Sequence, residues 1–360
     1  MCSCYGLILV YSAAYVGRGI PPGFMMQAGA CGVGLLAALV ISQIDYDFLC
    51  RLWPLFALPT LILMGLTFTS LGYNVSGTDD TAWLGFPFGS GRPLFTFQPS
   101  ELMKILFIMT FSKHLAAVRG KINSPKALLG LCAHGLAPAL LVFMQGDDGT
   151  ALIFLCVCGI MLFSAGLHPL YFLGAGVAAV PVGYLLWRHL DAQKVGRILA
   201  LIHPEEYLDT YSWQQTNGLT ALGLGGLSGV GYLKGGTVAQ FARNNDFIFT
   251  VAGEEFGFLG SLALLALLLG VILSLLIAAK KARESVGSGI CIGMAALIAS
   301  QSVINLGMNL RLLPVIGITL PFFSAGGSSV LTLYLGIGLA LSVCFYSRLN
   351  EKTTIFSRGR

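Results

Sequence analysis

Residues 247–279 read FIFTVAGEEFGFLGSLALLALLLGVILSLLIAA and form the longest apolar stretch of the chain. From Phe258 onward it contains no ionisable side chain. An α-helix of about 20 such residues crosses the hydrocarbon core of a bilayer, which is about 30 Å thick. The stretch therefore predicts a transmembrane helix. Because its 33 residues exceed one span, we expect its beginning to lie in a loop, in a cavity or at the membrane interface.

Nine further apolar stretches, most of them 17–20 residues long, accompany this one. They are residues 1–17, 27–44, 52–71, 99–117, 127–144, 150–166, 169–187, 287–306 and 327–346. Together they predict an all-α polytopic membrane protein of about ten transmembrane helices, arranged as a single domain over residues 1–360. The segment 188–246, between the seventh and eighth helices, is predicted to be a long extracytoplasmic loop, and loops of this length usually carry function.

Composition supports the membrane assignment. Charged residues make up 10% of the chain, apolar residues 56%, and the mean hydropathy is +0.80. A soluble domain carries roughly 25% charged residues, so a water-soluble function is excluded. The nine cysteines show no zinc-binding spacing and are expected to be small buried apolar residues. The net charge of +5 is expected to reflect membrane orientation, and no nucleic-acid partner is expected.

Lys and Arg residues predict the orientation of the chain, because they accumulate on the cytoplasmic side. With a cytoplasmic N-terminus, the inner segments carry twelve of them: Arg51, Lys113, Arg119, Lys121, Lys126, Lys280, Lys281, Arg283, Arg348, Lys352, Arg358 and Arg360. The short outer loops carry three: Arg18, Arg92 and Arg311. Both termini are therefore expected in the cytoplasm.

Two pairs of polar residues stand near predicted span ends. Glu101 and Lys104 are three residues apart, which places them on one face of a helix. They form a structural ion pair, a direct contact with substrate, or both, since ionisable residues in a membrane span are commonly functional. Asp147 and Asp148 lie between two spans. They either form a tight turn with capping carboxylates, in which Asp148 or Thr150 starts the next helix, or offer oxygen ligands to a divalent cation.

Asp246 lies where the long loop meets the eighth apolar stretch. At 100° per residue, Gly253, Gly257 and Gly260 fall close to its azimuth, so this face is expected to pack tightly against a neighbouring segment. Asp246 itself is either a helix N-cap or a functional carboxylate.

Three motifs, in order along the chain, resemble the SEDS family of RodA, FtsW and SpoVE. They are Phe97-Gln-Pro-Ser-Glu101-x-x-Lys104; Asn245-Asp246-Phe-Ile-Phe with Gly253-Glu-Glu-Phe-Gly-Phe258; and Leu313-Pro-Val-x-Gly-x-x-Leu-Pro-Phe-x-Ser324-x-Gly-Gly-Ser-Ser329. Weaker matches are Gly6–Ala13, Gln145–Ala151, and Gln214 followed by Ala221–Gly226. The ordered set covers nearly the whole chain.

The resemblance implies a peptidoglycan glycosyltransferase in the bacterial cytoplasmic membrane. Such an enzyme polymerises lipid II, a disaccharide-pentapeptide on undecaprenyl diphosphate, beside a class B penicillin-binding protein, for elongation, division or sporulation. It further implies an essential aspartate at Asp246, a buried pair at Glu101 and Lys104, a substrate-side position for Gln214, and use of a divalent cation, Mg or Mn.

Glycosyl transfer needs a base for the acceptor hydroxyl and positive charge for the departing diphosphate. Asp246 is suited to the first task. Arg197, Lys234 and Arg243 are loop cations that either meet the diphosphate or are solvated surface charges. The rival functions are a lipid II flippase and a non-catalytic scaffold for the penicillin-binding protein. A flippase requires charges along a path through the bundle, whereas the intramembrane charges here lie near the predicted outer face.

Overall fold

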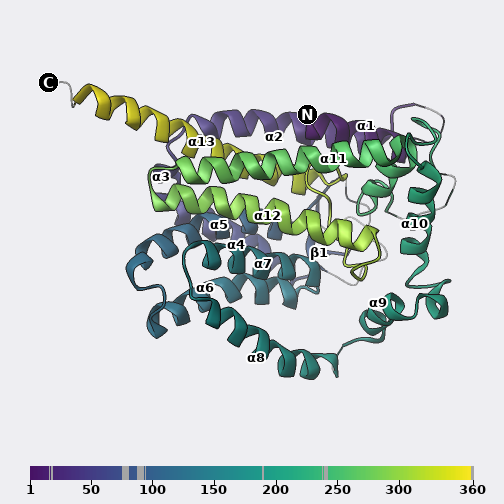
Figure 1. The fold of residues 1–360 in the computed structure, drawn as a ribbon, viewed down its shortest axis with the longest axis horizontal. Helices are drawn as coiled ribbons and strands as arrows, with labels where there is room; N and C mark the ends of the chain where they lie inside the picture. The colour runs from purple at the N-terminus through teal and green to yellow at the C-terminus, as the bar shows by residue number, and fades with distance from the viewer. Residues whose placement is uncertain are drawn as a thin grey trace. The chain divides into compact units, whose positions relative to one another are not determined.

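The computed structural model describes residues 1–15, 17, 19–74, 81–86, 93, 95–188, 190–236, 238 and 242–357, with side chains up to residue 347. Each predicted apolar stretch contains one helix in this part of the chain (Figure 1). These ten helices are α1 (Cys2–Ala14), α2 (Pro22–Ser42), α4 (Trp53–Leu66), α5 (Pro99–Ala117), α6 (Pro125–Met144), α7 (Asp148–Ser164), α8 (Pro169–Trp187), α11 (Ile248–Lys281), α12 (Ser285–Asn309) and α13 (Gly327–Ser357). The prediction of a helical, multi-pass membrane protein is confirmed.

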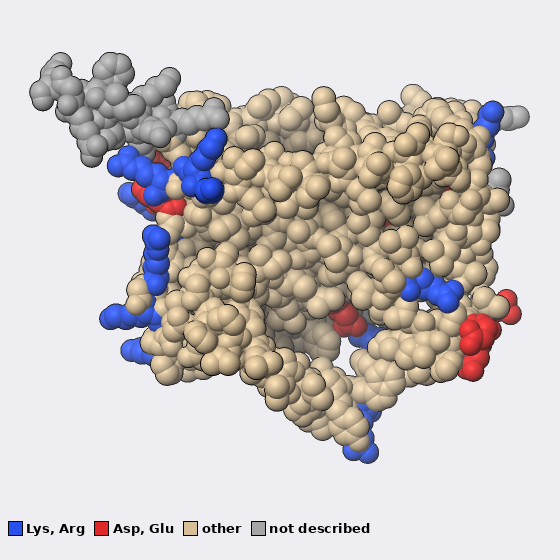
Figure 2. Space-filling view, in the orientation of Figure 1, with Lys and Arg blue, Asp and Glu red and all other residues tan. Residues whose placement is uncertain are grey.

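The distribution of charge agrees with this architecture. In Figure 2, uncharged side chains cover the sides of the apolar helices, and Lys and Arg gather near helix ends. Arg18, Arg92, Arg358 and Arg360, which entered the count for orientation, lie outside the described residues, as do the side chains of Arg348 and Lys352.

Shorter elements occupy the connecting segments. The predicted long loop contains α9 (Ala192–Ile202), the 3₁₀ turn η2 (Pro204–Tyr207) and α10 (Trp213–Gly225). Elsewhere lie α3 (Tyr46–Arg51), the turn η1 (Arg119–Lys121) and an antiparallel sheet of β1 (Gly72–Tyr73), β2 (Trp83–Phe86) and β3 (Phe95–Phe97). In the sheet, Leu84 of β2 pairs with Gly72 and with Phe97. The all-α prediction did not include this small sheet.

The chain folds into two compact units. The first unit contains Met1–Met25, Gly166–Leu268 and Gln301–Ala325. The second contains Met26–Ala165, Leu269–Ser300 and Gly326–Arg360. The expectation of a single domain over residues 1–360 stays a prediction.

The second unit is built around α5. Twelve of its nineteen residues are buried, and α4, α6, α7 and α13 all pack against it. Phe107 stacks on Phe111 and meets Phe154 of α7 edge to face, at ring distances of 4.9 and 5.5 Å. Such aromatic pairs add to the packing that holds membrane helices together. A helix so enclosed by its neighbours can carry polar side chains away from lipid.

In the first unit, α11 is interrupted at Gly257, whose φ of 67° and ψ of −160° are not helical. In an unbroken helix, the N–H groups of Phe258 and Leu259 donate to the carbonyls of Glu254 and Glu255. Here the two N–H groups donate instead to the carbonyls of residues 226 and 227, at 2.9 and 3.2 Å. The two carbonyls accept from the N–H groups of residues 230 and 231, at 2.9 and 3.1 Å. The loop after α10 therefore replaces both lost helical bonds.

This interruption explains the excess length of residues 247–279. The turn before Gly257 packs against α10 and the loop that follows it, and the unbroken apolar helix begins after the break. Tight packing on the glycine face is confirmed: a Cβ on Gly225 would collide with the carbonyl of Gly253, and a Cβ on Gly257 would collide with the backbone of Gly229.

Candidate active site

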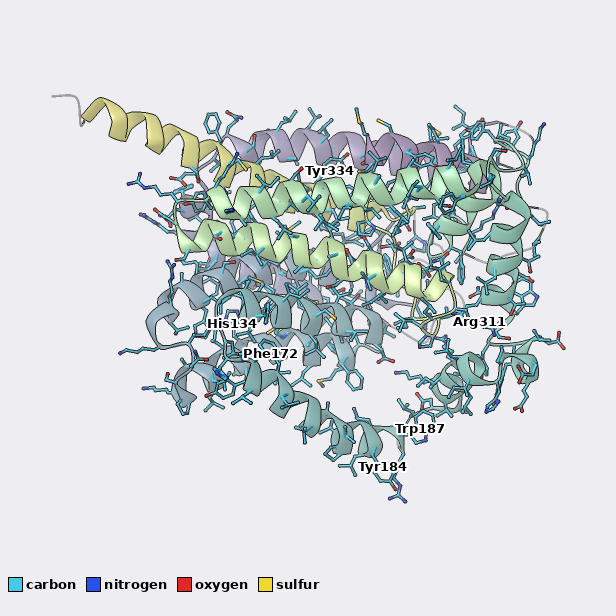
Figure 3. All side chains as sticks on the ribbon, in the orientation of Figure 1. His134, Phe172, Tyr184, Trp187, Arg311 and Tyr334 are labelled. Carbon is cyan, nitrogen blue, oxygen red and sulfur yellow. The ribbon has the colours of Figure 1, made fainter. Side chains whose placement is uncertain are left out.

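The backbone carbonyls of Asn244 and Asn245, two consecutive residues in the loop before α11, accept hydrogen bonds from the segment that follows α12. The carbonyl of Asn244 accepts a hydrogen bond from the backbone N–H of Ala325 at 2.8 Å. The carbonyl of Asn245 accepts one from the hydroxyl of Ser324 at 2.6 Å. These two hydrogen bonds fix the path of the chain into Asp246. Figure 3 labels Arg311, which lies in the same segment after α12.

The carbonyl of Asp246 is held by two buried amides of α12. Asn305 and Asn309 lie one turn apart, both fully buried, and their Nδ2 atoms are 2.8 and 2.9 Å from this carbonyl oxygen. Asn305 also donates to the carbonyl of Ile318 at 2.7 Å. Because a buried amide without partners is costly, these bonds stabilise one backbone geometry at residue 246.

The carboxylate of Asp246, in contrast, is left available for chemistry. It accepts no hydrogen bond from the part of the chain that the structure describes, and the residue is partly exposed. It therefore does not cap α11. Its Oδ2 lies beside Gly317, where a Cβ would be 3.8 Å away. Desolvation by burial raises the pKa of Asp246 to about 6, which suits a group that must accept a proton near neutral pH.

Arg243 lies in an ion cluster three residues before Asp246. Its Nη2 is 2.7 Å from Oε2 of Glu254 and 3.6 Å from Oε1 of Glu255. The arginine side chain is 14% exposed and both glutamate side chains are 1% exposed, so Arg243 is not a solvated surface charge. Glu255 also accepts a hydrogen bond from the hydroxyl of Ser12 on α1 at 2.6 Å. The cluster ties the loop before Asp246 to α11; contact of Arg243 with substrate stays a prediction.

The other predicted residues of the first unit lie in the long loop. Lys234 is exposed, Arg197 on α9 is half-buried, and Gln214 is half-buried in the first turn of α10. Its neighbour Gln215 is buried and donates to the carbonyls of Met308 and Leu313, at 2.8 and 2.7 Å. The substrate roles of Lys234, Arg197 and Gln214 stay predictions, whereas Gln215 ties α10 to the segment after α12.

Glu101 and Lys104 belong to the second unit and form the predicted pair. Nζ of Lys104 is 2.8 Å from Oε1 of Glu101, and their side chains are 3% and 7% exposed, respectively. The hydroxyl of Thr332 on α13 lies 3.4 Å from the other carboxylate oxygen. The pair is thus a buried ion pair that connects α5 to α13. The alternative of direct contact with substrate stays a prediction.

The acidic turn before α7 is a helix cap. Asp147 is the N-cap residue, and its Oδ1 accepts a hydrogen bond from the N–H of Thr150 at 2.8 Å. Its Oδ2 accepts another from the amide of Gln98 at 2.7 Å. The capping prediction is confirmed, with Asp147 as the capping residue.

Sequence reasoning did not assign Asn305, Asn309 or the role of Ser324. A signal existed, because two amides spaced by four residues in an apolar 25-residue helix are costly in a membrane and mark one buried face. What the sequence does not reveal is their partner, a backbone carbonyl about sixty positions away.

These features define a class of protein: a multi-pass helical membrane protein with one available carboxylate fixed at a loop–helix junction. The family model described as "Cell cycle protein", of FtsW, RodA and SpoVE, matches residues 1–349. The chain belongs to this family, as its motifs predicted.

Relatives by sequence agree with that membership. The probable peptidoglycan glycosyltransferase FtsW of Geobacter metallireducens is 32% identical, covering 95% of this chain and 91% of the relative. Stage V sporulation protein E of Bacillus subtilis is 30% identical, covering 95% and 94%.

Solved structures share the fold. A chain from a peptidoglycan synthase complex, described as coordinating polymerization and crosslinking, matches with a TM-score of 0.81 and 26% identity, covering 96% of this chain and 95% of that one. The rod shape determining protein RodA of Thermus thermophilus matches with a TM-score of 0.67 and 27% identity, covering 96% and 93%.

Proposed function

We propose that this protein is a peptidoglycan glycosyltransferase that polymerises lipid II at the outer face of the bacterial cytoplasmic membrane. Membership of a family whose relatives are named peptidoglycan glycosyltransferases supports the reaction. The observation that carries the proposal is the carboxylate of Asp246. It is free of hydrogen bonds from the described residues, while four hydrogen bonds hold the backbone carbonyls of residues 244–246.

In this reaction, Asp246 is the general base. Its carboxylate takes the proton of the acceptor sugar hydroxyl while the hydroxyl oxygen bonds to the anomeric carbon of the donor and the bond to the diphosphate breaks. A pKa near 6 leaves the carboxylate mostly ionised at pH 7 and still basic enough to accept the proton. The fixed backbone keeps the carboxylate in one place, which lowers the entropic cost of the reactive geometry.

The residues near Asp246 can hold a divalent cation if oxygen atoms of the substrate supply some of its ligands. The described residues contain no group of three or more His, Cys, Asp or Glu side chains that would form a cage from the protein alone. Mg²⁺, however, commonly binds one or two carboxylates together with substrate phosphates and water. Asp246 is the residue that would offer the carboxylate, and the bound cation would neutralise charge on the leaving diphosphate.

We further propose that a class B penicillin-binding protein is the partner and that both termini are cytoplasmic. The resemblance to a chain of a synthase complex that both polymerises and crosslinks supports the partner. The excess of Lys and Arg in the segments assigned to the inside supports the orientation. This orientation exposes Asp246 to the side on which the glycan strand grows.

The test is polymerisation of fluorescent lipid II by the purified protein with its penicillin-binding partner, with and without EDTA. We expect glycan polymer that disappears with EDTA and returns with Mg²⁺ or Mn²⁺. Transbilayer movement of lipid II without polymer would identify a flippase instead. Polymer made only by the partner, at the same rate without this chain, would identify a scaffold.

A further inference from the structure

A groove in the second unit is lined by none of the residues assigned to glycosyl transfer. Its volume is about 620 Å³, within the range of pockets that hold small molecules. Its lining residues come from one stripe of α5 and from α4 and α6. The lining residues are Met103, Leu106, Phe107, Thr110, Lys113, His114 and Ala117 of α5, Trp53, Ala57 and Leu61 of α4, and His134, Ala137, Pro138 and Leu141 of α6.

The polar groups in the middle of the groove satisfy one another. Thr110 donates its hydroxyl to the carbonyl of Leu106 at 2.9 Å, and so accepts from Nε2 of His134 at 3.2 Å. Nδ1 of His134 is then unprotonated and accepts from Nδ1 of His114 at 3.1 Å. Figure 3 labels His134 on α6. This chain of hydrogen bonds pairs the polar groups in the middle of the groove with one another and leaves the space suited to an apolar occupant.

One end of the groove is cationic. Nζ of Lys113 donates to the carbonyl of Cys50 at 2.9 Å and keeps two further N–H donors. The chain just beyond it carries Arg119, Lys121 and Lys126, all exposed, with no Asp or Glu between residues 102 and 146. Asp45 and Asp47 also lie near Cys50, where Arg51 pairs with Asp47 at 2.6 Å, so basic groups outnumber acidic ones at this end. This end therefore attracts a negatively charged group.

We propose that the groove binds an anionic glycerophospholipid, with its phosphate at Lys113 and one acyl chain along α5 toward Met103. Those two residues are ten positions apart, a rise of about 15 Å along the helix, which accommodates much of an acyl chain. Trp53 lies in the groove wall at the first turn of α4, and tryptophan favours the depth at which lipid headgroups meet the apolar core. This binding site is additional to the glycosyltransferase function and does not depend on it.

Native mass spectrometry of the purified full chain tests the proposal, with dioleoylphosphatidylglycerol and dioleoylphosphatidylcholine as probes. We expect retention of phosphatidylglycerol over phosphatidylcholine. Lys113→Gln should weaken phosphatidylglycerol binding about fivefold, since one basic side chain contributes roughly that factor toward an anionic lipid. Lys280→Gln, which removes an exposed lysine outside the groove, should leave binding unchanged.

A second pair of variants tests the location. Ala137→Trp places a large side chain in the groove and should abolish retention of phosphatidylglycerol, whereas Leu140→Trp, at a residue that is 57% exposed on the same helix, should not. Thermal unfolding in detergent confirms that both variants fold. Equal retention of the two lipids, or equal loss in both tryptophan variants, would overturn the proposal. Displacement of phosphatidylglycerol by undecaprenyl phosphate at equal concentration would also overturn it, because the groove would then belong to the polyprenyl substrate.

Discussion

The side-chain amide of Asn305 lies 2.8 Å from the backbone carbonyl oxygen of Asp246, and the same nitrogen is 2.7 Å from the carbonyl of Ile318. One buried amide thus joins the end of the long loop, α12 and the segment after α12. The position of the Asp246 carboxylate therefore depends on a residue 59 positions later in the chain.

Replacing Asn305 tests this dependence. Asn305→Ala leaves two buried carbonyls without one of their donors and should lower the free energy of unfolding by about 1–3 kcal/mol. Polymerisation should slow by roughly tenfold to a hundredfold, since small displacements of a catalytic group have effects of that size. We expect the loss in kcat rather than in KM. Val303→Ala, at an exposed position of the same helix, should change neither quantity; an Asn305→Ala variant with normal kcat would contradict the positioning role.

The pH dependence of polymerisation should report Asp246. Because the pKa of this carboxyl is raised to about 6, it is protonated and inactive as a base below that pH, so the initial rate should rise with pH to a half-maximum near 6. The unfolded chain has the lower pKa of 3.8, so the contribution of Asp246 to stability falls as pH rises from about 4 to about 6 and is constant above that. A rate that is constant between pH 5 and 7 would count against this role.

The break in α11 should make one glycine irreplaceable. Gly257 has a positive φ, and a Cβ there would meet the backbone of residues 227 and 229, so Gly257→Ala should cost more than about 1–3 kcal/mol of stability. Gly270, on the same helix, has open space around its Cα. Gly270→Ala should be neutral or slightly stabilising, because alanine favours helix more than glycine does. Thermal unfolding of both variants measures the difference; equal effects would show that the break is not required.

The ion cluster should respond to loss of its cation. Arg243→Met leaves Glu254 and Glu255 buried without their counter-ion, which typically costs about 3–5 kcal/mol. Adding Glu254→Gln should restore part of that stability, because the second change removes one of the unpaired charges. A double variant no more stable than Arg243→Met alone would mean that Arg243 contributes mainly through other contacts.

Much of the fold could be predicted from the sequence, because hydropathy alone locates a helix that lipid must surround. The predicted stretch 99–117 coincides with α5, where Pro99 marks the first turn. The stretch 327–346 falls short of α13, which continues to Ser357 through polar residues that hydropathy does not register. The strands β1–β3 are two to four residues long, too short to show alternation.

The sequence predicted those parts of the candidate site that consist of ionisable side chains in or beside a membrane span. Asp246 is an ionisable group at a span boundary, and Glu101 and Lys104 pair at helical spacing, so both features were predicted. The ion pair between Arg243 and Glu254 could not be predicted, since it depends on how the loop folds back on α11. Supports such as Asn305 act through backbone carbonyls, which every residue has and no sequence pattern marks.

Conversion of lipid II by the Asp246→Asn variant decides whether this carboxylate is the general base of polymerisation. The amide keeps the shape of the side chain but cannot act as a base, and Asp209→Asn, in the same loop, is the matched control. Polymer length and yield, measured by gel electrophoresis of labelled lipid II with the intact partner complex, should be normal for Asp209→Asn and absent for Asp246→Asn. Normal polymer from Asp246→Asn would contradict the account.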